Sequence, residues 1–449
     1  MLNQKPKYYV WIFISILCYS LLAFVIHRWQ TTYLLSTYGL LFLVYLGISN
    51  EAKPEHLPFW LSISVVFRLI FLFSLPSLSE DFYRFIWDGR LWNAGYHPFA
   101  ELPSIYLQQG IANIDQALFS KLNSPEYFTI YPPVAQFIFW LSVKVSPTSI
   151  VGSVIFMRLV LLLAEVGVVI LMRKLLIQFS IPLTNVLLYA LNPLVIIELT
   201  GNLHFEGLVF FFILLTIYSL GRQRIIQSAA SISLAIATKL VPVIFLPALL
   251  RTQGYKGALK YGGLIVIFSL LFFLSMFDYQ VFQSMVTSVG LYFNKFEFNA
   301  SLYYLVREYG FWKYGYNIIQ TVGWKLAVAA TALILLFTFR KKWIGIDSAR
   351  DSSQQLLSDF LWILCLYFLF TTTLHPWYIT TLLALSVFTP YRFPMIWSGL
   401  IFLTYSGYRA DSFKENLWLI ALEYLLVIGY LIVELKKSKG LFVFIQKKT

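Results

Sequence analysis

The chain has few charged residues, almost no cysteine and too much apolar sequence for an ordinary soluble protein. Only 12% of its 449 residues are charged and 59% are hydrophobic, whereas a soluble domain has about 25% charged residues. This composition predicts a membrane protein whose apolar segments face lipid. Cys18 and Cys365 lie in apolar runs, so they predict two buried hydrophobic side chains and carry no information on redox compartment.

Several common functional motifs are also missing. The sequence contains no Gly-x4-Gly-Lys-Ser phosphate loop, no His-Glu-x-x-His pair and no cysteine cluster with zinc spacing. It shows no internal repeat and no low-complexity tract. The net charge of +13 comes from basic residues in short loops and near the C-terminus. That pattern suits anionic lipid and membrane topology, and not nucleic acid.

Apolar runs that suit membrane segments recur along the whole chain. They lie near residues 8–27, 31–49, 57–75, 152–172, 182–200, 205–220, 261–277, 316–339, 357–373, 376–390, 393–408 and 416–435. Shorter runs at 226–238 and 240–250 flank Lys239 and predict a hairpin of half-depth helices. The short run 132–146 predicts a re-entrant or surface-lying helix. We therefore expect an all-α bundle of about 12–14 membrane segments.

The distribution of basic residues predicts an orientation, because lysine and arginine accumulate in cytoplasmic loops. The rule is satisfied if the N-terminus is cytoplasmic and residues 132–146 do not cross. The basic residues then placed inside are Arg173, Lys174, Arg222, Arg224, Arg251, Lys256, Lys260, Arg340, Lys341, Lys342, Arg392 and the C-terminal lysines. This layout predicts one membrane domain over 1–435, a long outer loop at 76–151 and a basic cytoplasmic tail at 436–449. It suits a bacterial inner membrane with both termini in the cytoplasm.

The predicted outer loop contains an unusual concentration of charge. Residues 78–90 read LSEDFYRFIWDGR and hold three acids and two arginines. Charge is costly beside a membrane, so a cluster of this kind needs a use. If the segment is helical, Arg84 and Asp88 follow Asp81 at i+3 and i+7 and share its face. Arg90 lies off that face.

Further polar motifs fall on the same predicted side of the membrane. They are Gly95-Tyr96-His97-Pro98-Phe99, Tyr131-Pro132-Pro133, Asn192-Pro193-Leu194 with Glu198, Asn202-Leu203-His204-Phe205-Glu206, Lys239-Leu240-Val241-Pro242, Phe298-Asn299-Ala300-Ser301 and His375-Pro376-Trp377-Tyr378. Together with residues 78–90, their order resembles that of GT-C glycosyltransferases, especially polyprenol-phosphate-mannose-dependent mannosyltransferases. Phe85 and Phe99 replace tyrosines usual in that family, and Glu206 replaces an aspartate.

The resemblance implies an all-α GT-C membrane fold and transfer of mannose or a related hexose. The donor would be a polyprenyl-phosphate sugar, and the acceptor a hydroxyl of a glycan or glycolipid on the extracytoplasmic face. Such enzymes invert the anomeric centre. Many family members carry Asp-x-Asp in the first outer loop, but here Ser79 occupies the first position. A metal-binding role is therefore in doubt. We assign no metal ligands and no cofactor, and the sequence does not exclude a divalent metal.

The expected chemistry suggests roles for individual residues. An alcohol is a poor nucleophile, so a carboxylate must accept its proton. Asp81 matches the family's outer-loop acid and is the predicted base; the alternative is a salt bridge to Arg84, and Glu80 is a rival acid. The departing phosphate needs basic or hydrogen-bonding groups. The predicted donor-binding residues are Arg84, Lys239, His375, Trp377 and Tyr378. Further site candidates are Glu80, Asp88, Arg90, Tyr131, Asn202, His204, Glu206 and Asn299.

Less specific interpretations accompany these roles. Lys239 could anchor a helix end by snorkelling, and Trp377 with Tyr378 could belong to an interfacial aromatic belt. Asp88 and Arg90 are more typical of residues that fix a loop. At the level of the whole protein, the alternatives are a transporter or flippase of lipid-linked sugars and a membrane glycan ligase or polymerase. The polar residues gather on one face without internal repeats, which favours an enzyme over a conduit.

Overall fold

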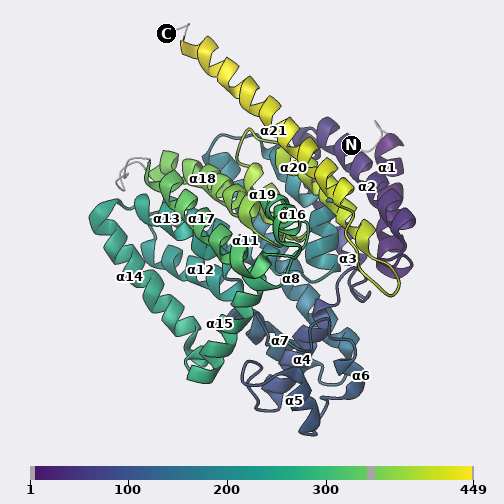
Figure 1. Ribbon diagram of the computed structural model, residues 1–449. Coiled ribbons are helices and arrows are strands. Elements are labelled where there is room, and N and C mark those ends of the chain that lie inside the picture. Colours follow the sequence, from purple (N-terminus) through teal and green to yellow (C-terminus); the bar gives the residue numbers. More distant parts are fainter. Residues whose placement is uncertain (1–5, 341–348, 447–449) are drawn as a thin grey trace.

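The apolar runs become helices, since in a helix each backbone polar group finds its partner within the segment. In the computed structural model, which describes residues 6–340 and 349–446, no strand forms and the chain is a helical bundle (Figure 1). Seven of the described helices are long and apolar enough to cross a membrane. They are α1 (Pro6–Phe24), α2 (Thr31–Glu51), α8 (Ile150–Gln178), α14 (Gly254–Phe272), α17 (Ile319–Phe339), α18 (Ala349–Phe370) and α21 (Leu417–Gln446). The expected all-α, multi-pass membrane fold is confirmed.

The other expected spans are shorter or broken helices. They are α3 (Leu57–Leu69), α9 (Leu187–Ala190), α10 (Pro193–Val195), the π-helix η3 (Ile196–Gly201), α11 (Glu206–Gly221), α19 (Tyr378–Ser386), α20 (Phe393–Leu400) and η7 (Ile401–Gly407). The segments 183–190 and 193–201 meet at an angle of 50°. Pro193 lacks a backbone N–H, and Asn192 caps the new helix by accepting from the Leu194 amide at 2.9 Å. The bend therefore has a local cause.

Two short helical segments flank Lys239, as the sequence predicts. Helix α12 (Ile225–Thr238) ends where Lys239 adopts an extended backbone. The chain then forms η4 (Val241–Phe245) and α13 (Leu246–Arg251). Pro242 lies in the first turn of η4, where its missing N–H costs no helical hydrogen bond. Lys239 consequently stands at a break between helices.

A separate layer of helices, which we call the outer layer, lies at one end of the molecule. It consists of α4 (Asp81–Asn93), α5 (Pro103–Gln108), α6 (Gln116–Phe119) and α7 (Pro133–Val145), and Figure 1 shows both termini at the opposite end. The remaining helices are α15 (Tyr279–Asn294), α16 (Leu302–Tyr314), η1 (Pro54–His56), η2 (Leu183–Val186) and η5 (Leu274–Met276). Part of the expected tail continues α21; its last residues, 447–449, and Lys341 and Lys342 lie outside the described residues.

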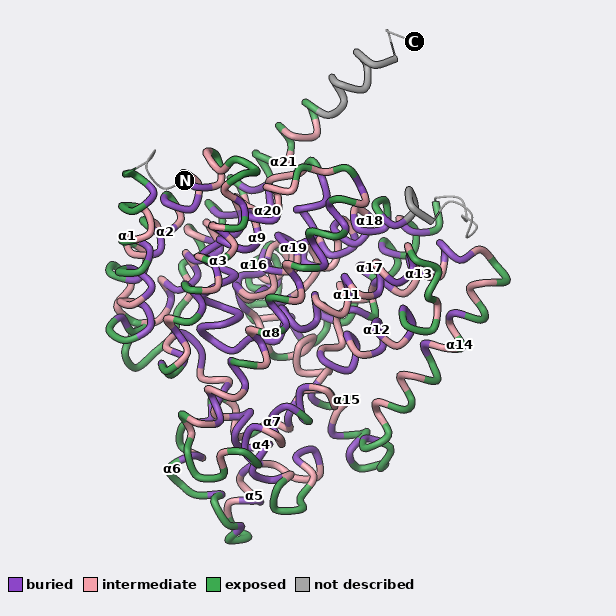
Figure 2. The backbone as a smooth tube through the Cα atoms, turned by 180° about the vertical axis from the view of Figure 1, so that it is seen from behind, coloured by how far each residue is buried: buried purple, intermediate pink, exposed green. Residues whose placement is uncertain are grey.

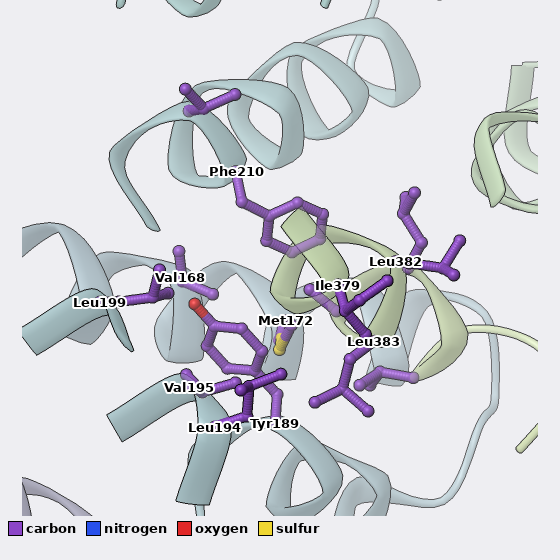
Figure 3. Close-up of a cluster of buried hydrophobic side chains, with 14 of the residues drawn as sticks. Val168, Met172, Tyr189, Leu194, Val195, Leu199, Phe210, Ile379, Leu382 and Leu383 are labelled. Atoms are coloured by element: carbon purple, nitrogen blue, oxygen red, sulfur yellow. The ribbon is translucent and has the colours of Figure 1, made fainter. Parts of the chain in front are cut away.

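The bundle core lies where α8, α11 and α19 meet the broken span, and Figure 2 shows buried residues concentrated inside. Figure 3 shows this cluster, in which Met172, Tyr189 and Phe210 pack against Leu382 and their neighbours. Lipid is as apolar as these side chains, so close packing stabilises the bundle more than water exclusion does. The core gives the site a rigid support.

Two of the buried arginines hold the core together. Arg68 pairs with Glu165 at 3.0 Å. Arg158, only 1% exposed, donates to backbone carbonyl oxygens at two helix ends. These belong to Phe71, Leu72, Ser74, Thr200 and Gly201. Arg158 thus ties the segment that precedes Asp81 to the turn that precedes His204.

Candidate functional site

A cavity of about 310 Å³ lies between the outer layer and the bundle. Its wall comes from the start of α4, residues 130–132, the start of α11, residues 239–245, α15, the end of α18 and the start of α19. Seven of the fourteen predicted site residues line it. They are Asp81, Tyr131, His204, Glu206, Lys239, Trp377 and Tyr378. Motifs far apart in the sequence therefore form one pocket.

Asp81 is the first residue of α4 and is half-buried. Its Oδ1 accepts a hydrogen bond from Asn123 Nδ2 at 2.6 Å. Burial raises the pKa of the Asp81 carboxyl, while the Asn123 hydrogen bond and the Lys239 charge oppose that rise. A carboxylate with a raised pKa is a better proton acceptor, so Asp81 suits general-base chemistry.

Lys239 and Glu206 form an ion pair in the cavity wall. Lys239 Nζ lies 2.5 Å from Glu206 Oε1, and the two side chains are 20% and 6% exposed. Lys239 is the only lysine or arginine among the described residues that line the cavity. Its ammonium group also lies 6.0 Å from the ring of Tyr378. The pair places a donor and an acceptor side by side in a largely apolar environment.

Three rings form a stack behind this pair. Trp377 stacks on His204 with ring centroids 3.7 Å apart and on His375 with centroids 4.3 Å apart. The two imidazoles make no ring contact with each other in the described structure, so they cover opposite faces of the indole. Burial lowers the pKa of both histidines, helped by the Lys239 charge, to about 3 for His375. Because both faces of Trp377 are covered, only its edge is available to a ligand. Because their pKa values are lowered, both histidines are neutral.

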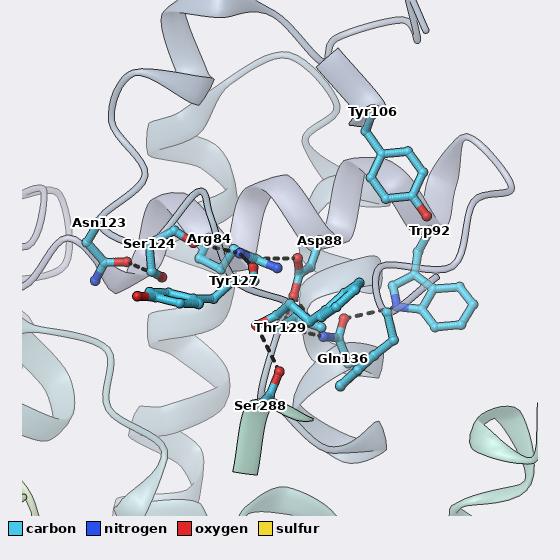
Figure 4. A network of polar contacts seen from close by, with 12 residues as sticks. Arg84, Asp88, Trp92, Tyr106, Asn123, Ser124, Tyr127, Thr129, Gln136 and Ser288 are labelled. Atoms are coloured by element: carbon cyan, nitrogen blue, oxygen red, sulfur yellow. Dashed lines mark hydrogen bonds and ion pairs between the residues drawn. The ribbon is translucent and has the colours of Figure 1, made fainter. Parts of the chain in front are cut away.

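Arg84 and Asp88 belong to a polar network beside the cavity and do not line it (Figure 4). Arg84 Nε donates to Asp88 Oδ1 at 2.9 Å, so Arg84 pairs with Asp88 and not with Asp81. Asp88 Oδ2 also accepts from Thr129 and Gln136. Arg84 further donates to the carbonyl oxygens of Ser124 and Tyr127. The network joins α4 and α7 to the loop that carries Asn123.

A family model described as the N-terminal domain of alpha-(1->6)-mannopyranosyltransferases matches residues 17–252, more than half of the chain. The protein belongs to this family. It is a glycosyltransferase that transfers mannose, and the resemblance to GT-C mannosyltransferases is confirmed. The match includes Asp81, Glu206 and Lys239. No curated protein and no solved structure matches the chain significantly.

The remaining predicted residues of this mannosyltransferase have partners away from the cavity. Glu80 pairs with Arg28 at 2.6 Å, Arg90 donates to the Asn113 carbonyl at 2.6 Å, Asn202 donates to Glu198 at 3.2 Å, and Asn299 donates to Glu423 at 3.1 Å. His375 stands behind Trp377 and also does not line the cavity. Within the described residues, no group of three or more His, Cys, Asp or Glu side chains could hold a metal ion.

Two further residues belong to the candidate site and were not predicted from the sequence. Asn123 holds Asp81, and Tyr292 of α15 lines the cavity. Asn123 lies in a loop without periodic pattern, and Tyr292 lies in a helix with no charged motif. No signal in the sequence alone singled out either residue.

Proposed function

We propose that this mannosyltransferase moves mannose from a polyprenyl-phosphate donor to a hydroxyl of a glycan or glycolipid acceptor, forming an α-(1→6) linkage. The observation that carries the proposal is the cavity itself. Its lining includes the half-buried carboxylate of Asp81 and the ammonium group of Lys239, which is the one cation among the described lining residues. This pairing of a base with a cation suits attack by an alcohol on a sugar phosphate.

The apolar part of the cavity supports a lipid-linked donor. Apolar side chains line it beyond the polar residues: Val209, Ile213, Leu240, Val241, Ile244, Phe245, Leu364 and Phe368. Such a wall suits the hydrocarbon chain of a polyprenyl carrier, and Lys239 suits its phosphate. Arg84 and His375, which we also expected at the phosphate, are respectively paired with Asp88 and shielded by Trp377. We therefore assign the phosphate to Lys239.

In the proposed reaction, the acceptor hydroxyl attacks C1 of mannose from the side opposite the phosphate. Asp81 accepts the hydroxyl proton as the new C1–O bond forms. The bond between C1 and the phosphate oxygen breaks, and the polyprenyl phosphate leaves with that electron pair beside Lys239. This single in-line displacement inverts C1, so a β-linked donor gives an α-linked product.

The layout of the molecule supports a site on the extracytoplasmic face of a bacterial inner membrane. Helices α4–α7 and both termini lie at opposite ends of the molecule (Figure 1). The positive-inside rule places the basic ends in the cytoplasm. The Asp81 cavity, next to the outer layer, would then face outward.

The proposal is tested with protein in nanodiscs that is given radiolabelled polyprenyl-phosphate mannose and a pool of glycan and lipid acceptors. Transfer of the label to an acceptor is measured. Wild type and Asp115→Asn, a change in the exposed cap of α6, should transfer label, and Asp81→Asn should lose about 100-fold or more of the rate. Full activity of Asp81→Asn would refute the assigned base. If wild type transferred nothing but moved the donor across proteoliposome membranes, a transporter would replace the enzyme.

A further inference from the structure

Glu206 carries a carboxylate oxygen that the ion pair with Lys239 does not use. Lys239 holds Oε1, whereas Oε2 is buried and has no hydrogen-bond partner among the described residues. Glu206 is buried and lines the cavity. A buried charged oxygen without a partner is costly. Because Glu206 lines the cavity, a ligand that binds there can supply the missing hydrogen-bond donor.

The charge of Glu206 restricts what that ligand group can be. A carboxylate oxygen only accepts hydrogen bonds, and its negative charge repels phosphate. A hydroxyl group satisfies it, because a hydroxyl donates. Lys239 and Glu206 therefore bind different parts of a sugar phosphate. The ammonium group binds the phosphate, and the carboxylate binds a hydroxyl of the sugar.

The short distance between the paired groups indicates which hydroxyl is bound. The phosphate is attached to C1 of the sugar, and Glu206 Oε1 lies 2.5 Å from the ammonium that would bind that phosphate. The hydroxyl nearest to C1 is the one on C2. In mannose this hydroxyl is axial, and in glucose it is equatorial. We propose that Glu206 Oε2 accepts a hydrogen bond from the C2 hydroxyl of the transferred sugar and so selects mannose over glucose.

The surroundings hold Glu206 in the position that this role needs. Lys239 fixes one oxygen, and Glu206 begins α11 directly after the turn that Arg158 anchors at Thr200 and Gly201. His204 in the same turn is held by its stack on Trp377. A rigid acceptor discriminates between epimers better than a mobile one, because it cannot follow a displaced hydroxyl.

This inference rests on the proposed function. A cycle of enzyme variants and donor analogues distinguishes failure of the inference from failure of the proposed function. Transfer rates from mannosyl, 2-deoxy-mannosyl and glucosyl polyprenyl phosphates are compared in wild type and Glu206→Ala. Wild type should lose about 10- to 100-fold in kcat/KM when the C2 hydroxyl is removed or inverted. In Glu206→Ala that loss should shrink to about 3-fold or less, because the partner is gone. Intrinsic differences in donor reactivity cancel, since both enzymes face the same donors.

Controls address a purely structural role of Glu206. Glu308→Ala removes an exposed acid that is paired with Arg307 on α16, and it should keep the full C2 effect. A 6-deoxy donor should behave alike in all the enzymes. If Glu206→Ala does not fold, Glu206→Asp keeps the charge beside Lys239 but withdraws the oxygen by one methylene, and it should also lose the C2 effect. An unchanged C2 effect in a folded variant overturns the inference, whereas failure of wild type with the mannosyl donor overturns the proposed function.

Discussion

Asn123 donates a hydrogen bond from its side-chain amide to Asp81 Oδ1 at 2.6 Å. Asn123 is exposed and lies in the loop between α6 and α7, whereas Asp81 begins α4. Arg84 holds the same loop through the carbonyl oxygens of Ser124 and Tyr127. The proposed base is therefore oriented by a loop that α4 itself anchors.

Loss of the Asn123 contact should shift the pH dependence of transfer. Burial already raises the pKa of Asp81, and the Asn123 hydrogen bond opposes that rise. In Asn123→Ala the pKa should rise further, so the acid limb of kcat/KM should move to higher pH. Transfer near that limb should fall about 2- to 10-fold. The pH–rate profile measures this shift. Gln109→Ala, an exposed change at the end of α5 in the outer layer, is the control and should leave the acid limb in place. A shift of the limb to lower pH in Asn123→Ala would contradict the prediction.

Removal of the charge at Lys239 should weaken use of the donor. Lys239→Gln leaves Glu206 unpaired and deprives the phosphate of its cation, so kcat/KM for the donor should fall about 10- to 100-fold. Lys239→Arg keeps the charge and should retain a larger share. Steady-state kinetics with varied donor concentration checks this. Lys260→Gln, an exposed change on α14, is the matched control, and equal kinetics for the two glutamine variants would exclude Lys239 from donor binding.

Asp88 should matter for stability. It is fully buried and accepts hydrogen bonds from Arg84, Thr129 and Gln136. Asp88→Ala leaves the buried Arg84 charge without its partner, which should destabilise the outer layer by about 3–5 kcal/mol. Asp115→Ala removes only the exposed cap of α6 and should cost about 1 kcal/mol. Thermal melting in nanodiscs should rank the two variants in this order, and equal melting temperatures would contradict it.

Gly89 permits the close approach of α4 and α7. A Cβ at this position would lie 2.4 Å from the backbone carbonyl oxygen of Phe139, which explains glycine within the Trp-Asp-Gly-Arg sequence. Gly89→Ala should push the helices apart and destabilise the protein by about 1–3 kcal/mol. Gly263→Ala in α14 meets no atom within 4 Å and should be neutral or stabilising. Melting temperatures of the two variants provide the measurement; a Gly89→Ala protein as stable as wild type would show that the contact can relax.

The fold class could be predicted from the sequence because membrane helices appear as long apolar runs. Helical spacing also placed Arg84 and Asp88 on a shared face, where they form an i,i+4 pair. Local patterns could not predict that Asp81 lines the cavity while Arg84 and Asp88 pair beside it. As the first residue of α4, it lies next to the loop and the cavity, so its contacts depend on tertiary structure.

The stack of Trp377 between two histidines shows the same limit. The motif containing His375 and Trp377 predicts an aromatic surface, but the covering ring of His204 comes from a distant part of the chain. Spacing within a motif carries no information on such a partner. Similarly, the apolar run near 182–200 predicts a span, while its bend depends on Pro193 and on the cap at Asn192.

The cavity is lined by residues inside and outside the part of the chain that the family model matches. Its two acids, Asp81 and Glu206, and Lys239 lie within the matched residues 17–252, whereas Tyr292, Trp377 and Tyr378 lie beyond them. A fragment truncated after residue 252 would keep all three charged groups but lack these three aromatic residues. Swapping the C-terminal half between homologues would therefore exchange these aromatic residues while preserving the charged groups, which makes this half the natural target for engineering substrate preferences other than the C2 selection assigned to Glu206.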